Sequence, residues 1–408
     1  MNNAAASLSL FEGFGIEIEY MIVDARTLDV RPLCDRLFTE VNGELVDEIE
    51  RGPIAWSNEL ACHLVELKTN GPAPTLDGVH AAFATDVRFI NGVLQKFQAR
   101  LLGTGMHPWM DPNELTMWPG GQNEIYEAYD RIFSCKGHGW ANLQSVHINL
   151  PFANDDELAR LHTAIRFLLP IIPALSASTP IVEGRRSGWL DYRMEVYRHN
   201  ARRIPSIAGH IVPEDIHSKA DYEQRIFQPM WRDIAPHDPG RIMQEEWLNS
   251  RGAIARFDRN AIEIRVVDCQ EAPRADLAIV EAVVGVLRRF VDSDASLRAA
   301  RSGWTTQALA DLFLHVIQDG EAAVLPADYV ELLTGQARRS TGTELWSALL
   351  DGVALTAPAQ SALAVLLTQG TLARRILRAV HADIGRGALT RVYSRLGDCL
   401  QANEMFVG

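Results

Sequence analysis

Four short segments, far apart in the chain, alternate between apolar and polar residues with a period of two. In the first, residues 14–23, apolar side chains alternate with Glu17 and Glu19. This alternation predicts a β-strand with one buried and one polar face. The two carboxylates should then project from one face, about 6.5–7 Å apart at their Cα atoms. Taken alone, the segment is more typical of the wet face of an antiparallel sheet than of a site.

The other three segments repeat this pattern with a carboxylate or an imidazole between apolar neighbours. They are residues 64–69 with Glu66, residues 145–150 with His147 and Asn149, and residues 261–267 with Glu263 and Arg265. Each has a structural explanation by itself, such as a hydrogen-bonded histidine or a cross-strand salt bridge. That explanation would have to hold independently in all four segments. If the four strands share one sheet, their polar faces can instead line one concave surface.

Such a surface would carry four carboxylates and one imidazole, which need divalent cations to be tolerated together at neutral pH. Oxygen-rich ligation with one histidine suits Mg²⁺, or Mn²⁺, better than a structural zinc site. Because Mg²⁺ usually binds through a few carboxylates plus substrate phosphates, several such ions indicate a polyphosphate ligand. Arg265 could then reach a phosphate, while Arg193 and Arg198 could hold a substrate carboxylate or could simply belong to a solvated loop.

The remaining motifs mainly exclude other classes of enzyme. The glycine-rich segment 103–109 could let backbone N–H groups approach an anion, but it is not a Walker A sequence. No GxSxG or HExxH motif occurs, so neither hydrolase triads nor zincins have support.

The bulk composition predicts a soluble cytoplasmic protein. The formal net charge of −13 argues against nucleic acid or an anionic membrane as partner. The five cysteines are scattered and form no CxxC pair, which indicates reduced thiols. We expect no signal peptide, and the apolar run 167–177 is too short to span a bilayer.

The order of elements predicts an α+β protein with an open, mostly antiparallel sheet flanked by helices. We expect a sheet-containing body over 1–275 and a helical C-terminal part over 276–408, packed on the same body. Within the body we expect a hairpin turn at Asn42–Gly43, one helix running from about 77 to 102, and a loop over 183–213.

At this point several motifs resemble the glutamate–cysteine ligase type 2 family, in the glutamine-synthetase-like superfamily. They are FGIEIEY, SNELACHLVELKT, GTGMHPW, QSVHINLPF, ALSASTPIVEGRRSGWLDYRMEVYR and AIEIRVVDCQEAP, in the family's order over most of residues 11–275. The chain departs from the family's usual pattern at Ser145, where close relatives have a second histidine, and at Asn149.

The resemblance implies a funnel-shaped site for ATP, Mg²⁺ and an amino acid. It implies that a carboxylate, typically the γ-carboxylate of glutamate, is activated as an acyl phosphate and coupled to an amine. The residues in metal-binding positions are Glu17, Glu19, Glu59, Glu66, His147 and Glu263. We assign catalytic roles to Arg265 and Glu66, and substrate binding to Arg193, Arg198 and Asn149. We assign nucleotide binding to Arg265, Gly105 and His107.

Two other functions remain open from the sequence. One is a guanidino kinase on the same type of sheet, and the other is a catalytically silent binding protein, which would have no need to keep the acids. We also consider a homodimer, from the exposed edge strands of such folds.

Overall fold

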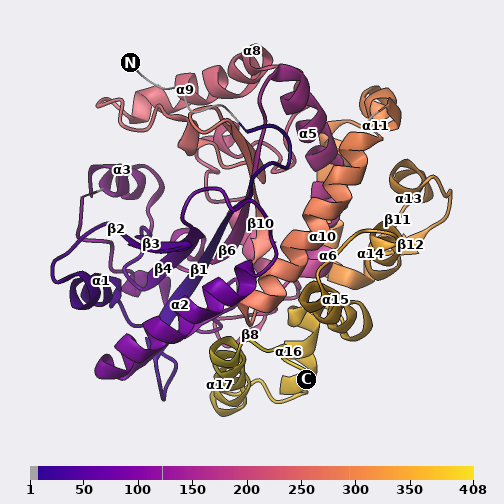
Figure 1. Ribbon diagram of the computed structural model, residues 1–408. Helices are drawn as coiled ribbons and strands as arrows, with labels where there is room; N and C mark the ends of the chain where they lie inside the picture. The colour runs from indigo at the N-terminus through magenta and orange to yellow at the C-terminus, as the bar shows by residue number, and fades with distance from the viewer. Residues whose placement is uncertain (1–7, 122, 294) are drawn as a thin grey trace.

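The computed structural model describes residues 8–121, 123–293 and 295–408. Its centre is an antiparallel sheet in the order β2-β3-β4-β1-β6-β10-β9, with β5 paired to the far end of β1 (Figure 1). The strands of this sheet are β1 (Gly15–Asp24), β2 (Glu48–Arg51), β3 (Ile54–Asn58), β4 (Leu64–Thr69), β5 (Ala99–Leu102), β6 (Ser145–Pro151), β9 (Ala253–Arg256) and β10 (Ala261–Asp268). Two small ribbons pair β7 (Ile181–Val182) with β8 (Arg185–Arg186), and β11 (Val324–Leu325) with β12 (Ser340–Thr341).

Helices surround the sheet and make up most of the C-terminal part. They are α1 (Cys34–Asn42), α2 (Val79–Leu94), α3 (Asn123–Phe133), α4 (His138–Ala141), α5 (Asp155–Leu168), α6 (Pro173–Ser176), α7 (Tyr192–Tyr197), α8 (Lys219–Tyr222), α9 (Gln228–Ile234), α10 (Pro273–Asp292), α11 (Ala295–Ala300), α12 (Thr306–Asp319), α13 (Ala327–Thr334), α14 (Gly342–Leu350), α15 (Ala357–Gln369), α16 (Leu372–Val380) and α17 (Arg386–Ala402). The predicted α+β class, with an open antiparallel sheet and a helical C-terminal region, is confirmed. No helix among the described residues is both long enough and apolar enough to cross a bilayer.

The apolar face of the sheet packs against helices. Ile16, Ile18 and Ile22 of β1 are fully buried in one large cluster with side chains of α2, α5 and α10. Figure 1 shows α2 and α10 side by side over this region, and the two helices are in contact. Burial of each such aliphatic side chain contributes about 1.5–3 kcal/mol to folding, so this face fixes the register of β1.

The opposite face of β1 changes character along the strand. Its first half carries Glu17 and Glu19, whereas Met21 and Val23 in its second half are buried in a second apolar cluster. Side chains of α16 and α17 cover that second half. The polar half is therefore the part of this face on which a site can form.

Three local predictions were wrong. The helix expected over 77–102 ends at Leu94, and β5 follows after a tight turn in which Gln98 has a φ of 54°. Asn42–Gly43 is not a hairpin turn but the end of α1, with Gly43 at a φ of 89° as its left-handed cap. The expected loop over 183–213 contains helix α7, which Asp191 caps through the backbone N–H of Met194.

Candidate active site

The strand register brings the predicted acids and the imidazole together on one face of the sheet. Glu17 lies opposite His147 across β1 and β6, and Glu19 lies opposite Glu66 across β1 and β4. On the other side of β6, Glu263 of β10 lies opposite Asn149. Directly opposed residues of antiparallel strands share a face, with Cβ atoms about 4.5–5.5 Å apart. The convergence expected from the four alternating segments is therefore present.

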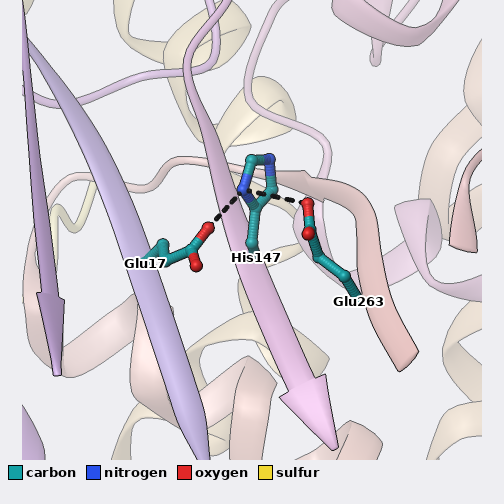
Figure 2. Close-up of side chains that lie close together, drawn as sticks. All are labelled: Glu17, His147 and Glu263. Atoms are coloured by element: carbon teal, nitrogen blue, oxygen red, sulfur yellow. Dashed lines mark hydrogen bonds and ion pairs between the residues drawn. The ribbon is translucent and has the colours of Figure 1, made fainter. Parts of the chain in front are cut away.

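His147 stands between two carboxylates, as Figure 2 shows. Its Nδ1 lies 2.9 Å from Glu17 Oε2 and 3.7 Å from Glu263 Oε1. Burial would raise the pKa of Glu17, but the hydrogen bond and charge of His147 lower it to about 2. Burial would likewise lower the pKa of His147, and the bond to Glu17 reverses that effect and raises it. Both acids therefore favour the protonated form of the His147 ring.

A second group of acids extends toward β3. Glu19 Oε2 accepts hydrogen bonds from the backbone N–H of Ser145 at 2.7 Å and from its hydroxyl at 3.1 Å. Glu66 Oε1 accepts one from Ser57 Oγ at 2.7 Å. Burial, followed by the charge of Glu17, raises the pKa of Glu66 to about 8.

Glu59 lies beside this second group. Burial and then the charges of Glu66 and Glu19 raise the pKa of the Glu59 carboxyl well above its usual range. The carboxylates of this group therefore repel one another, which is the effect that a bound cation would relieve.

A bulge in β10 shapes the last part of the site. Between Ile264 and Val267 the register with β6 shifts by one residue, so the two β10 residues between them oppose a single position on β6. Arg265 lies in this bulge, and its Nε is 2.8 Å from Glu263 Oε1. The guanidinium also approaches the Tyr197 hydroxyl, with Nη1 at 3.5 Å from the oxygen. Arg265 is thus held beside the acids.

Two cavities flank the row of acids. The smaller one, of about 210 Å³, is lined by polar groups of the sheet and by side chains of α3, α4, α7 and the segment before β9. Its charged residues are Glu19, Glu59, His147, Arg193 and Arg265. The larger one, of about 750 Å³, lies at the start of β1 and includes Glu17, Lys68, Asn149 and Arg259. Glu17 and Glu19, two residues apart, therefore face different cavities.

The residues predicted to bind substrate have different surroundings. Arg193 lines the smaller cavity and is buried, with its Nε 2.5 Å from Asp268 Oδ1. Asn149 lines the larger cavity and donates from Nδ2 to Glu17 Oε1 at 3.2 Å. Arg198 pairs with Glu195 at 2.6 Å and lines neither cavity. Two of the three thus lie at the site.

The structure does not bring Gly105 and His107 to the acids. Gly105 donates its backbone N–H to Ser178 Oγ at 2.8 Å, and a Cβ atom there would lie 2.7 Å from Asp268 Cγ. His107 is buried, with Nε2 2.7 Å from the carbonyl oxygen of Leu28. These contacts account for the glycine-rich loop by packing, so we assign neither residue to the nucleotide.

Sequence reasoning missed several residues of the site. Ser145 bridges two members of the row, because its Oγ lies 2.9 Å from His147 Nε2 as well as contacting Glu19. The alternation of its segment already predicts that Ser145 lies on the face of His147, but the pattern alone assigned it no role in the site. Aromatic side chains of helices and loops complete the wall of the smaller cavity: Tyr126, Tyr129, Trp140, Tyr197 and Trp247. No period-2 pattern marks these, since they converge only in the folded chain.

The residues of the row fit hard divalent cations. Two groups, Glu17–His147–Glu263 and Glu19–Glu66–His147, each offer three ligand atoms within 4.8 Å of one another. Asn149 Oδ1 is buried beside them, with no hydrogen-bond partner among the described residues. Carboxylate and amide oxygens with one imidazole form the donor set expected for Mg²⁺ or Mn²⁺.

Two solved enzymes share the fold of this chain. A solved glutamate–cysteine ligase of Francisella tularensis, in complex with AMP, matches 97% of this chain and 90% of its own, with a TM-score of 0.61 and 13% identity. A bifunctional glutathione synthetase of Pasteurella multocida matches 95% of this chain and 53% of its own, with a TM-score of 0.58 and 13% identity. At such identities the likeness shows a shared fold.

The chain belongs to glutamate–cysteine ligase family 2, whose model matches residues 13–395. An uncharacterized protein of Archaeoglobus fulgidus is 29% identical over 96% of this chain and 100% of its own length. A Roseiflexus protein named "Putative glutamate--cysteine ligase 2" is 27% identical over 52% of this chain, which spans about half of that relative's length. The family resemblance predicted from the sequence is confirmed, and it places the chain among the carboxylate–amine ligases.

Proposed function

We propose that the protein is an ATP-dependent ligase that activates a carboxylate as an acyl phosphate and couples it to an amine. The observation that carries this proposal is the row of acids between two cavities of unequal size. ATP binds in the larger cavity, and the acid substrate binds in the smaller one, where Arg193 and Arg265 supply positive charge. The glutamate γ-carboxylate is the proposed acid, as in the relatives' name.

The reaction has two steps. A carboxylate oxygen of the acid attacks the γ-phosphorus of ATP, the bond from that phosphorus to the β,γ-bridging oxygen breaks, and ADP leaves. The amine then attacks the acyl carbon, inorganic phosphate leaves, and the amine loses a proton to give the amide. Neither step needs a nucleophilic side chain, because positioning and charge neutralisation supply most of the rate enhancement in phosphoryl transfer.

The chain's own residues would divide these tasks. Arg265, held against Glu263, would stabilise charge on the transferred phosphoryl group. Arg193 would bind the carboxylate of the acid, and Asn149 would contact ligands from the side of the larger cavity. Mg²⁺ ions would be held by Glu17, Glu19, Glu66, His147 and Glu263, with Glu59 beside them. When bound, these ions supply charge neutralisation to the phosphates of ATP.

A hydroxamate assay tests this function without knowledge of the natural amine. Hydroxylamine attacks acyl phosphates, so Mg-ATP, L-glutamate and hydroxylamine should give glutamyl hydroxamate and ADP in equal amounts. Other acids replace glutamate in a parallel screen, with mass spectrometry of the products. The Glu263→Gln variant should lose this activity. Glu321→Gln is a matched control, because Glu321 pairs with Arg374 at 2.6 Å in the helical C-terminal region and lines neither cavity.

Three results would contradict the proposal. ADP release with a guanidino compound alone would identify a kinase, and Mg-ATP binding without ADP release from any acid would identify a silent binding protein. Unchanged activity in Glu263→Gln would remove the acid row from the reaction.

A further inference from the structure

Asp268 is the point at which the motifs of this sequence meet, yet no step of the proposed reaction uses it. It is fully buried at the end of β10. Its Oδ2 accepts hydrogen bonds from the backbone N–H of Ser178 at 2.8 Å, from the Ser178 hydroxyl at 3.2 Å and from the Thr179 hydroxyl at 3.2 Å. Its Oδ1 lies 2.5 Å from Arg193 Nε. A carboxylate with four donors is a rigid anchor.

The bulge in β10 places Asp268 on the face of the acids. Glu263 pairs with Asn149 and Asp268 pairs with Ser145, so a step of five residues along β10 matches a step of four along β6. In a regular strand, residues five apart point to opposite faces. The one-residue shift cancels that difference, and it directs Asp268 to the side on which Glu263 and Ser145 lie.

The glycine-rich loop is shaped around this carboxylate. A Cβ atom at Gly105 would lie 2.7 Å from Asp268 Cγ and 2.8 Å from Thr179 Cγ2. The glycine-rich segment 103–109 and the motif ALSASTPIVEGRRSGWLDYRMEVYR therefore both contribute atoms that contact Asp268, which itself ends the EIRVVD part of the last motif. This convergence gives the glycine-rich loop a packing role, although it lies outside the smaller cavity.

Arg193 is the member of this cluster that reaches the smaller cavity. Its Nε is bound by Asp268, its Nη2 donates to the carbonyl oxygen of Arg265 at 3.3 Å, and its backbone N–H donates to Thr179 Oγ1 at 3.0 Å. None of these contacts uses Nη1. Burial and then the charge of Asp268 raise the pKa of neighbouring Asp191, so the two acids favour a single negative charge beside Arg193.

We propose that Asp268 is a positioning residue that locks the Arg193 guanidinium in the orientation needed to bind the carboxylate of the acid substrate. This inference rests on the function proposed above. A long, unbound arginine side chain has several rotamers, and its immobilisation before binding removes an entropic cost that the substrate would otherwise meet. Loss of Asp268 should therefore raise the KM for the acid more than it lowers kcat.

A double-mutant cycle tests this with the hydroxamate assay, using Mg-ATP, hydroxylamine and varied L-glutamate. Asp268→Asn and Arg193→Gln should each raise the KM for glutamate about 10- to 100-fold, the range for hydrogen bonds to charged groups. The double variant should be no worse than Arg193→Gln alone, because Asp268 acts through Arg193. Thr179→Val removes only the hydroxyl that contacts both Asp268 and the backbone N–H of Arg193, so it should raise the KM for glutamate by a smaller factor. This variant replaces Asp268→Asn in the test if Asp268→Asn does not fold.

A matched control separates positioning from stability. Glu271 and Arg375 form another fully buried pair, with an N–O distance of 2.5 Å, and they line neither cavity. Glu271→Gln should lower the melting temperature as Asp268→Asn does but leave the KM for glutamate unchanged.

Additive effects in the cycle, or an equal rise in KM in Glu271→Gln, would overturn the positioning role. A wild-type protein that makes no hydroxamate from any acid is a different outcome, since it refutes the proposed function on which this inference rests.

Discussion

Replacement of Glu66 by glutamine should make the protein more stable when no divalent cation is present. Glu66 is buried at the centre of the acid row, and burial with the charge of Glu17 raises its pKa from 4.5 to about 8. A group whose folded pKa is raised above its unfolded value destabilises the fold increasingly as the pH rises from the unfolded to the folded pKa. Glutamine has nearly the same shape and removes this cost.

The size of the effect follows from the two pKa values. At 1.36 kcal/mol per unit, the cost of Glu66 is about 0.8 kcal/mol at pH 5, about 3.4 kcal/mol at pH 7 and about 4.7 kcal/mol at pH 9. These are upper values, because neighbouring acids share the proton. We expect Glu66→Gln to gain about 2–3 kcal/mol at pH 7 and almost nothing at pH 5.

Urea denaturation in EDTA at several pH values measures this gain directly. Glu214 is a matched control, because its pKa is shifted in the opposite direction from that of Glu66. Burial would raise the pKa of Glu214, but its bonds to Arg251 lower it. Glu214→Gln should therefore destabilise the protein at pH 7, with the loss shrinking as the pH falls through the folded pKa. Added Mg²⁺ should stabilise the wild type more than Glu66→Gln. If Glu66→Gln were no more stable than the wild type anywhere between pH 6 and 8, the reasoning about the acid row would be wrong.

Three further outcomes follow from the structure. Gly105→Ala should cost about 1–3 kcal/mol in urea denaturation, because its Cβ would lie 2.7 Å from Asp268 Cγ; an unchanged midpoint would contradict this. Burial lowers the pKa of His63 and of His107 to about 4, so each contributes stability that is complete above pH 6.5 and is lost as the pH falls toward 4, about 3 kcal/mol per histidine. Unfolding free energy that stays flat from pH 7 to 4.5 would refute that contribution. Calorimetry should show that Glu17→Gln loses Mg-ATP binding, and retained binding would count against the placement of ATP in the larger cavity.

The acid row could be predicted from the sequence because each strand carries its own signal. Alternation puts Glu17 and Glu19 on one face whatever the surroundings, and the same holds for Glu66 and His147. A shared sheet then brings the four together through backbone pairing alone. Local pattern and final geometry agree here, since an antiparallel ladder preserves the face of every residue that enters it.

The rest of the site could not be predicted in this way. Asp268 lies five residues from Glu263, which an alternation rule assigns to the opposite face, and only the bulge corrects it. His107, although it lies in the glycine-rich segment 103–109, is held by the carbonyl oxygen of Leu28, a contact between segments far apart in the chain. Trp140 of α4 and Trp247 of the segment before β9 both reach the smaller cavity, so their proximity depends on tertiary packing.

The placement of Glu17 and Glu19 in different cavities has a consequence for inhibitor design. Two ligands can approach the same acids from different sides, so neither has to leave before the other enters. A single compound that occupies both spaces must cross the row of carboxylates between them, and a neutral or cationic linker would be tolerated there where an anionic one would not. Such bridging compounds would gain from covalent linkage of two weak binders, provided that their linker follows the short step along β1 from Glu17 to Glu19.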